Sequence, residues 1–80
     1  MKKIYVIVCH YEYNCYNSDR KFISREKNED GIIKFTNTIN EAIAFDEHRI
    51  AENYLVMVVQ NKKISTFGIK SFAVEQHFVD

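Results

Sequence analysis

The chain has 80 residues, of which 46% are hydrophobic, and its eleven basic residues balance eleven acidic ones. This composition excludes intrinsic disorder, which needs low hydrophobicity and high net charge. It also provides no global field that would attract nucleic acid or an anionic membrane. No stretch approaches the roughly 20 apolar residues that span a bilayer. We therefore expect one small cytoplasmic domain, residues 1–80, with no membrane partner.

The first predicted strand is Ile4–Tyr13. Its first half is apolar on both faces and its second half on only one, which suits a strand that enters the middle of a sheet and leaves toward solvent. Two shorter strands, Lys21–Arg25 and Ile32–Thr36, are predicted next. Asp30 and Gly31 lie between them and predict a hairpin, because glycine tolerates positive φ.

A helix is predicted from Ile39 to Asn53. Thr38 and Glu41 fit a capping box, in which the Thr38 hydroxyl accepts from the Glu41 N–H and the Glu41 carboxylate reaches back to the Thr38 N–H. At the helical period one apolar stripe would face the core. The stripe consists of Ile39, Ala42, Ile43, Ile50 and Tyr54.

The continuous apolar run Tyr54–Gln60 predicts a central strand. Ile64–Lys70 reads as a further strand, and Ser71–Val79 either extends it or adds an edge. The predicted fold is therefore α+β in the order β-β-β-α-β-β, with a mainly antiparallel sheet of about five strands and one helix packed on one face. The other face would be uncovered and would need a partner or a second copy of the chain.

The sequence contains no motif for catalysis, for a cofactor or for a metal. The potential ligands Cys9, His10, Cys15, His48 and His77 lack the tight pairs of zinc sites, and Cys9 and His10 would point to opposite faces of a strand. A cysteine thiolate paired with a distant histidine would be the alternative arrangement for nucleophilic catalysis. However, the chain has no nucleophile elbow and no glycine-rich phosphate loop. We expect no metal, no cofactor and no enzymatic activity.

Basic residues gather around the second and third predicted strands. They are Arg20, Lys21, Arg25, Lys27 and Lys34. With Phe22 and Phe35 as stacking surfaces they could bind single-stranded nucleic acid. Acidic residues interleave with them and nearly cancel their charge. Nucleic-acid binding by the hairpin, through Arg20, Lys21, Arg25 and Lys34, is therefore the alternative hypothesis.

Three tyrosines, Tyr11, Tyr13 and Tyr16, lie where the first strand would leave the sheet. Tyrosine is enriched at interfaces because it covers much area at low entropic cost and keeps a hydrogen-bonding tip. Tyr11 and Tyr13 could equally cap the edge of the core. The outer face of the predicted helix adds an acidic strip that could meet a basic partner. The strip consists of Glu41, Glu47 and Glu52. We predict that these tyrosines and acidic residues bind the partner.

The chain resembles small phage and prophage accessory proteins. The resemblance lies in the Lys-Ile-Tyr-Val-Ile strand at residues 3–7 and in the segment Phe35–Phe45, with Thr38, Glu41 and Ala42, continuing to Glu52. Some compact phage proteins of this size, including anti-CRISPR proteins, inhibit host defence by occupying a host protein's surface. The resemblance implies a non-enzymatic inhibitor of a host protein, such as a defence component, in the host cytoplasm. A homodimer is a further expectation, and a small-molecule or nucleotide site at a dimer interface is a third hypothesis.

Overall fold

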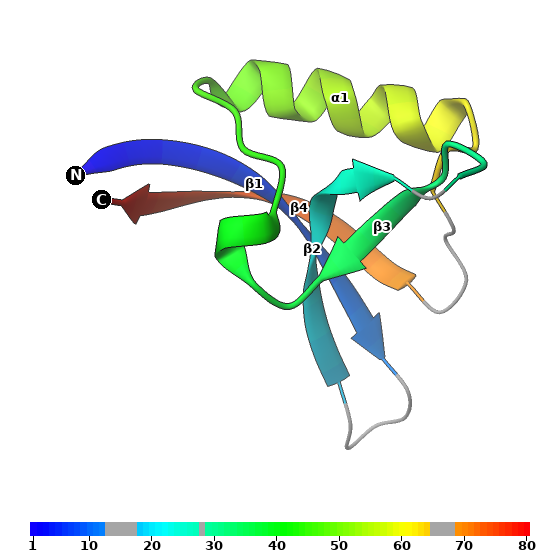
Figure 1. The fold of residues 1–80 in the computed structure, drawn as a ribbon. Coiled ribbons are helices and arrows are strands. Elements are labelled where there is room, and N and C mark those ends of the chain that lie inside the picture. The colour runs from blue at the N-terminus through cyan, green and yellow to red at the C-terminus, as the bar shows by residue number, and fades with distance from the viewer. Residues whose placement is uncertain (13–17, 28, 65–68) are drawn as a thin grey trace.

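The computed structural model describes residues 1–12, 18–27, 29–64 and 69–80. Over these residues the fold is α+β, with one α-helix and an antiparallel sheet of four strands in the order β3-β2-β1-β4 (Figure 1). In chain order the elements are β1 Lys2–Glu12, β2 Ser18–Lys27, β3 Ile33–Thr36, the 3-10 turn η1 Ile39–Glu41, α1 His48–Gln60 and β4 Ile69–Val79. The predicted fold class is confirmed, with four strands in place of about five.

β1 is a central strand, as its two-sided apolar pattern predicts. On one edge it pairs with β4, from Lys2 opposite Val79 to Tyr11 opposite Ile69. This pairing brings the two termini side by side (Figure 1). On the other edge only its second half pairs with β2, from Val8 to Glu12. The first half of β1 therefore needs another partner on that edge.

The segment 42–45 supplies this partner. The Tyr5 N–H donates to the Phe45 carbonyl at 2.8 Å, and the Phe45 N–H donates back to the Tyr5 carbonyl at 2.9 Å. Two residues earlier, the Ile43 N–H donates to the Ile23 carbonyl of β2 at 2.9 Å. The segment thus joins the first half of β1 to β2, and its backbone is held extended by these long-range hydrogen bonds.

The predicted hairpin is confirmed. β2 and β3 pair antiparallel, with Phe22 opposite Thr36 and Ile23 opposite Phe35. Gly31 has a φ of 80°, the left-handed conformation that glycine adopts without steric cost.

The one predicted helix is present, but its bounds, Ile39 to Asn53, are wrong by nine residues at the start and seven at the end, and the predicted strand Tyr54–Gln60 is wrong. A single 3-10 turn forms at η1, and the α-helix runs from His48 to Gln60. The apolar run reads as a strand because it is continuous, yet Ala51 and Val58 are buried at helical spacing while Val56 and Val59 between and beyond them are exposed. Packing of that face on the sheet outweighs the weak helix propensity of valine.

The predicted capping box is also wrong. Thr38 makes no side-chain cap, and the Glu41 N–H donates to the Thr38 backbone carbonyl at 3.1 Å. The Thr36 hydroxyl takes the role instead: it donates to the Glu41 carboxylate at 2.9 Å and accepts from the Thr38 N–H at 3.2 Å. The turn stops after Glu41 because the next residues are bound to β1 and β2.

The C-terminal strands also differ from prediction. Ser71–Val79 and Ile69 belong to one strand, β4. Ile64, the start of the other predicted strand, is buried and precedes β4 without pairing in it, while residues 65–68 lie outside the described part of the chain.

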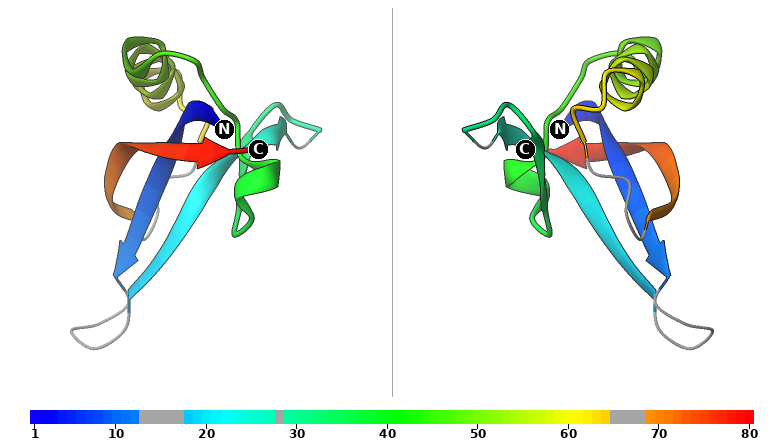
Figure 2. Two further views of the ribbon diagram at one scale, coloured as in Figure 1. Left: turned by 90° about the vertical axis from the view of Figure 1, so that its left-hand side faces the viewer. Right: turned by 90° about the vertical axis from the view of Figure 1, so that its right-hand side faces the viewer.

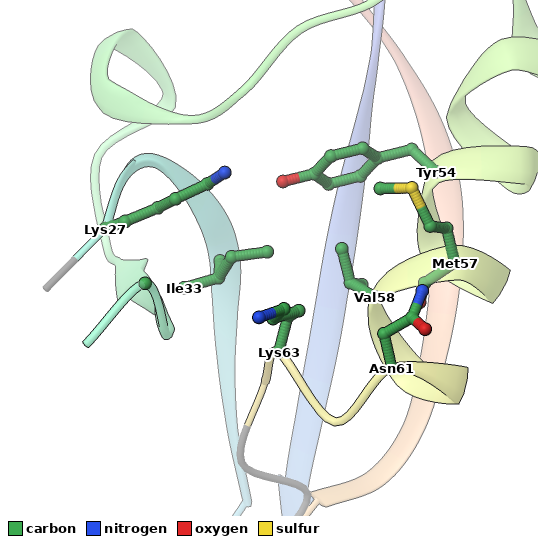
Figure 3. Close-up of a pocket in the computed structure, with 8 residues that line it drawn as sticks. Lys27, Ile33, Tyr54, Met57, Val58, Asn61 and Lys63 are labelled. Atoms are coloured by element: carbon green, nitrogen blue, oxygen red, sulfur yellow. The ribbon is translucent and has the colours of Figure 1, made fainter.

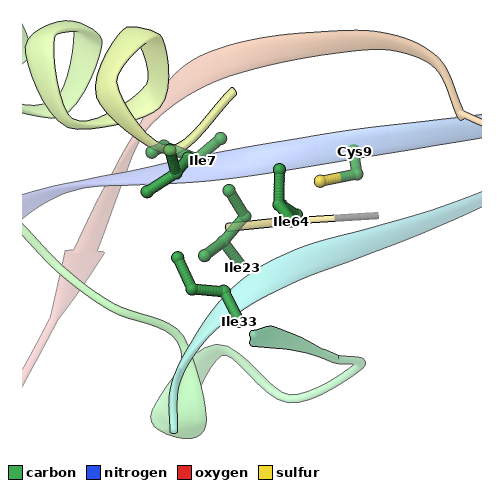
Figure 4. Close-up of a cluster of buried hydrophobic side chains, with 6 residues drawn as sticks. Ile7, Cys9, Ile23, Ile33 and Ile64 are labelled. Carbon is green, nitrogen blue, oxygen red and sulfur yellow. The ribbon is translucent and has the colours of Figure 1, made fainter. Parts of the chain in front are cut away.

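Each face of the sheet carries a buried cluster. The cluster under α1 contains Ile7, Cys9, Ile23, Ile33, Val58 and Ile64 (Figure 4). The cluster on the opposite face contains Ile4, Val6, Val8 and Ala42, with Phe22 and Ile39 packed against it. Figure 2 shows α1 and η1 on opposite sides of the strands. The prediction that this second face is uncovered is therefore wrong at the centre of the sheet, where Val6 has no exposed surface.

Within the described ranges, no helix combines the length and the apolar character needed to cross a membrane.

Substitution of Val58 tests the helical register of the run 54–60. Val58→Ala removes two buried methyl groups and should lower the free energy of unfolding by about 2 kcal/mol. Val56→Ala, a matched change at an exposed position of the same helix, should change it by less than about 0.5 kcal/mol. Urea denaturation measures both. Equal losses at the two positions would contradict the register.

Candidate binding groove between the helix and the hairpin

A groove with a volume of about 250 Å³ lies between α1 and the β2–β3 hairpin (Figure 3). Its lining residues come from three places: the hairpin, the second half of α1 and the turn that follows α1. They are Lys27, Gly31, Ile33, Tyr54, Met57, Val58, Asn61 and Lys63.

The end of α1 is closed by a Schellman arrangement. The Lys62 N–H donates to the Val59 carbonyl at 3.2 Å and the Lys63 N–H to the Val58 carbonyl at 2.9 Å. Lys62 has a φ of 54°, the left-handed conformation that this motif requires. The Asn61 side-chain amide satisfies a further carbonyl, that of Met57, at 2.9 Å. The turn therefore sets Asn61 and Lys63 at one end of the groove.

The same turn is attached to the hairpin. The Ile33 N–H of β3 donates to the Lys63 carbonyl at 2.7 Å. This hydrogen bond holds the C-terminal end of α1 against β3. Gly31 precedes β3 and has no neighbouring atom within 4 Å of the position a Cβ would take, so the groove is open at that side.

The floor of the groove is apolar and its rim is basic. Ile33 and Val58 are 3% and 1% exposed. Lys27 and Lys63 are exposed. In Figure 3 the Lys27 ammonium and the Tyr54 hydroxyl point toward one another across the opening. No carboxylate lies among the lining residues.

Burial raises the pKa of the Tyr54 phenol. The hydroxyl is therefore protonated at neutral pH and is available as a hydrogen-bond donor. Together with the two lysines it offers donors and positive charge to an anionic group, while the floor offers contact to an apolar one. An apolar side chain next to a carboxylate matches both.

The predicted tyrosine surface is placed only in part. Tyr11 is half-buried, packs edge-to-face on Phe35 with ring centroids 5.8 Å apart, and has the Lys21 ammonium 5.6 Å from its ring centroid. It contributes to the core cluster under α1. Tyr13 and Tyr16 lie outside the described residues.

The predicted acidic strip does not form on one helix face. Glu41 belongs to η1 and accepts from Thr36, Glu47 precedes α1, and Glu52 lies in α1 beside His48 with a nitrogen–oxygen distance of 3.3 Å. All three side chains are exposed. The strip fails because the helix begins nine residues later than its predicted start at Ile39.

The predicted basic surface is divided between the faces of the sheet. Arg20 forms an ion pair with Glu75 of β4, whereas Lys21, the next residue along β2, stands over Tyr11 on the helix side. Lys34 lies between Ile33 and Phe35, which both face α1, so it points away from the helix. Arg25 is exposed near the end of β2.

The two predicted stacking residues are separated as well. Phe22 packs with the cluster of Ile4, Val6 and Val8, and Phe35 packs with the cluster under α1. Arg20, Lys34 and Phe22 lie on the face of the sheet away from α1. Lys21 and Phe35 lie on the face toward α1, so the predicted set of basic and aromatic residues is divided between two surfaces.

Cys9 is buried, and burial raises the pKa of its thiol to about 12. It is a neutral thiol at physiological pH, so it is a poor nucleophile and a poor metal ligand. Among the described residues, no group of three or more His, Cys, Asp or Glu side chains could hold a metal ion. Cys15 lies outside these residues.

Comparison of the chain with protein-family models, with curated proteins and with solved structures gives no match.

Sequence reasoning missed most of the groove. The apolar run predicts a strand for Tyr54, Met57 and Val58, and a strand would send Met57 and Val58 to opposite faces. The hairpin signal at Asp30 and Gly31 did place the strand that carries Ile33 beside the second strand, and the structure shows Ile33 opposite Lys27. The spacing of Ala51, Tyr54, Leu55 and Val58 is the helical signal that identifies the α1 side.

The raised pKa of Cys9 predicts a pH dependence of stability. The unfolded thiol titrates near its ordinary value of 9.0 and the folded one near 12, so above about pH 9 the folded state binds more protons than the unfolded state. The contribution of Cys9 to stability is thus complete below pH 9 and is lost as the pH rises toward 12. Urea denaturation of wild type and Cys9→Ala at pH 7 and pH 10.5 measures it. The wild type should lose more stability over this interval than the variant; equal losses would contradict the burial of the thiol.

Proposed function

We propose that the protein is a non-enzymatic binding protein, and that its groove receives an apolar side chain flanked by a carboxylate from a segment of a partner protein. The observation that carries the proposal is the groove itself. Its floor is made by Ile33 and Val58, and its rim by Lys27, Lys63 and the hydroxyl of Tyr54. A carboxylate in that position would gain charge-assisted hydrogen bonds.

The size of the groove supports a protein partner over a small molecule. Pockets for small molecules have volumes of about 300–1,000 Å³ and bury most of the ligand. The groove, at about 250 Å³, suits one or two side chains instead. Anchoring of a few side chains in such pockets supplies most of the binding energy of a protein interface.

The surface beside the groove also supports a protein partner. Met57 is 47% exposed, and Ile50, two helical turns earlier on the same side of α1, is 45% exposed. An exposed aliphatic surface next to a pocket is typical of an interaction site.

The partner that we propose is a host protein, and inhibition is the consequence of occupying its surface. This part of the proposal is supported by the resemblance of the chain to phage accessory proteins. The neutral net charge supports recognition by local contacts over long-range attraction to nucleic acid.

Two peptides test the chemistry of the groove. A short peptide of alternating leucine and glutamate should shift the amide resonances of Gly31, Val58 and Lys63 in a ¹H–¹⁵N correlation spectrum. A leucine–lysine peptide of the same length should not, because its ammonium groups meet Lys27 and Lys63. The apolar content of the two peptides is equal, so equal binding would contradict the proposed preference for acidic segments.

A matched pair of variants tests the host partner. Met57→Asp places a carboxylate at the groove, and Val56→Asp makes the same change on the adjacent residue, which does not line the groove. In a pull-down from host lysate followed by mass spectrometry, wild type and Val56→Asp should enrich the same protein, and Met57→Asp should recover it at least about tenfold less well. Enrichment of no protein by the wild type, or equal enrichment by all three chains, would contradict the proposal.

A further inference from the structure

β4 is the outermost strand on its side of the sheet. It is 11 residues long, whereas the strand at the opposite edge, β3, has four residues. Along β4 the inner edge bonds to β1, and none of the described residues pairs with the outer edge. A strand at an edge presents a row of backbone N–H and C=O groups to any extended segment that can approach it.

From Ser71 to Val79, β4 lacks the usual features that keep edge strands from pairing, and its one register irregularity with β1 lies before this part, at Lys70. The chain contains no proline, and the register with β1 is continuous from Ser71 to Val79. The one lysine of the strand, Lys70, lies at its beginning. The charge of Glu75 is neutralised within the subunit by Arg20, and His77 lies 3.2 Å from the same carboxylate. From Phe72 to Val79 the edge is therefore long, regular and nearly uncharged.

β4 also carries a large apolar side chain that is exposed to solvent. Phe78 is 58% exposed, although it is the largest apolar side chain in the last part of the strand. Antiparallel pairing with Lys3 directs it to the same face as Val74, which is half-buried. An extended segment added outside β4 would lie beside both residues.

We propose that the outer edge of β4 pairs antiparallel with β4 of a second copy, about a two-fold axis that passes at Gln76. In this register Gln76 lies opposite Gln76 of the second copy. Glu75 lies opposite His77 of the other copy and Val74 opposite Phe78 of the other copy, and the two-fold axis makes each of these two pairs occur twice. Two-fold symmetry requires a surface that is complementary to itself. Here the acid meets a histidine and the exposed phenylalanine meets an aliphatic neighbour.

Neighbouring registers are less complementary. An axis at Glu75 places two carboxylates opposite each other, and an axis at His77 does the same with two imidazoles. An axis at Val74 places Phe78 opposite Lys70 and Glu75 opposite Ala73. Directly opposed residues on antiparallel strands interact most strongly, so these differences select the register at Gln76.

The resulting sheet is continuous across both copies, with four strands from each. Because opposite residues of an antiparallel pair point to the same side, both α1 helices lie on one face of this sheet. The groove beside α1 is formed by residues of one copy and is not altered by the pairing.

Cysteine cross-linking tests the register. In a Cys15→Ser background, Gln76→Cys should form a disulfide-linked dimer on mild oxidation, since opposite residues at the axis have Cβ atoms about 4.5–5.5 Å apart, close to disulfide geometry. Ser71→Cys is the matched control: it is exposed on the same strand, but the register separates it from its own copy by ten residues along the paired strands, about 33 Å. The control should stay monomeric. Equal cross-linking at both positions would overturn the register.

Analytical ultracentrifugation tests the association itself. The wild type should form a dimer in a concentration-dependent manner, and Gln76→Lys should raise the dissociation constant at least about tenfold, because it opposes two ammonium groups at the axis. Circular dichroism checks that the variant is folded. A wild type that stays monomeric at millimolar concentration overturns the proposal, and so does a dimer that Gln76→Lys does not weaken.

Discussion

The reciprocal hydrogen bonds between Tyr5 and Phe45 are the constraint on which the rest of the structure depends. β1 is buried on both faces, as the absence of exposed surface at Val6 and Ile7 shows. A buried strand must find partners for the polar groups of both backbone edges. β2 pairs with only the second half of β1, so the first half is completed by the segment that ends at Phe45. This requirement keeps residues 42–45 extended and delays the helix to His48.

The position of the groove follows from the same constraint. Because Phe45 is fixed to β1, α1 begins three residues later and crosses the face that carries Ile7 and Ile33. Its length then brings Val58 onto this cluster, and the turn after the helix reaches β3 through the hydrogen bond from Ile33 to Lys63. Both ends of α1 are therefore attached to the sheet, and the space between its second half and the hairpin is the groove (Figure 3).

Features with a local cause could be predicted from the sequence. β1 was predicted from its alternation, and the hairpin from Asp30 and Gly31, because the pleat and the positive φ of glycine act within a few residues. The helix could not be placed in the same way. Thr38 and Glu41 carry a strong local signal for the start of a helix. However, the backbone of Ile43 is hydrogen-bonded to Ile23 and that of Phe45 to Tyr5, and both partners are distant in sequence. The groove could not be predicted for the same reason, since Tyr54, Met57 and Val58 line it together only if residues 54–60 are helical.

Amide hydrogen exchange monitored by NMR tests the central claim most directly, because it reports each backbone hydrogen bond separately. If residues 42–45 complete β1, the amides of Tyr5, Ile43 and Phe45 should be protected as strongly as those in the middle of β1, and the amides from Glu52 to Gln60 should be protected in one continuous helical block. Exchange of the Phe45 amide at the rate of an unprotected peptide, with Thr38–Asn53 protected instead, would contradict the account.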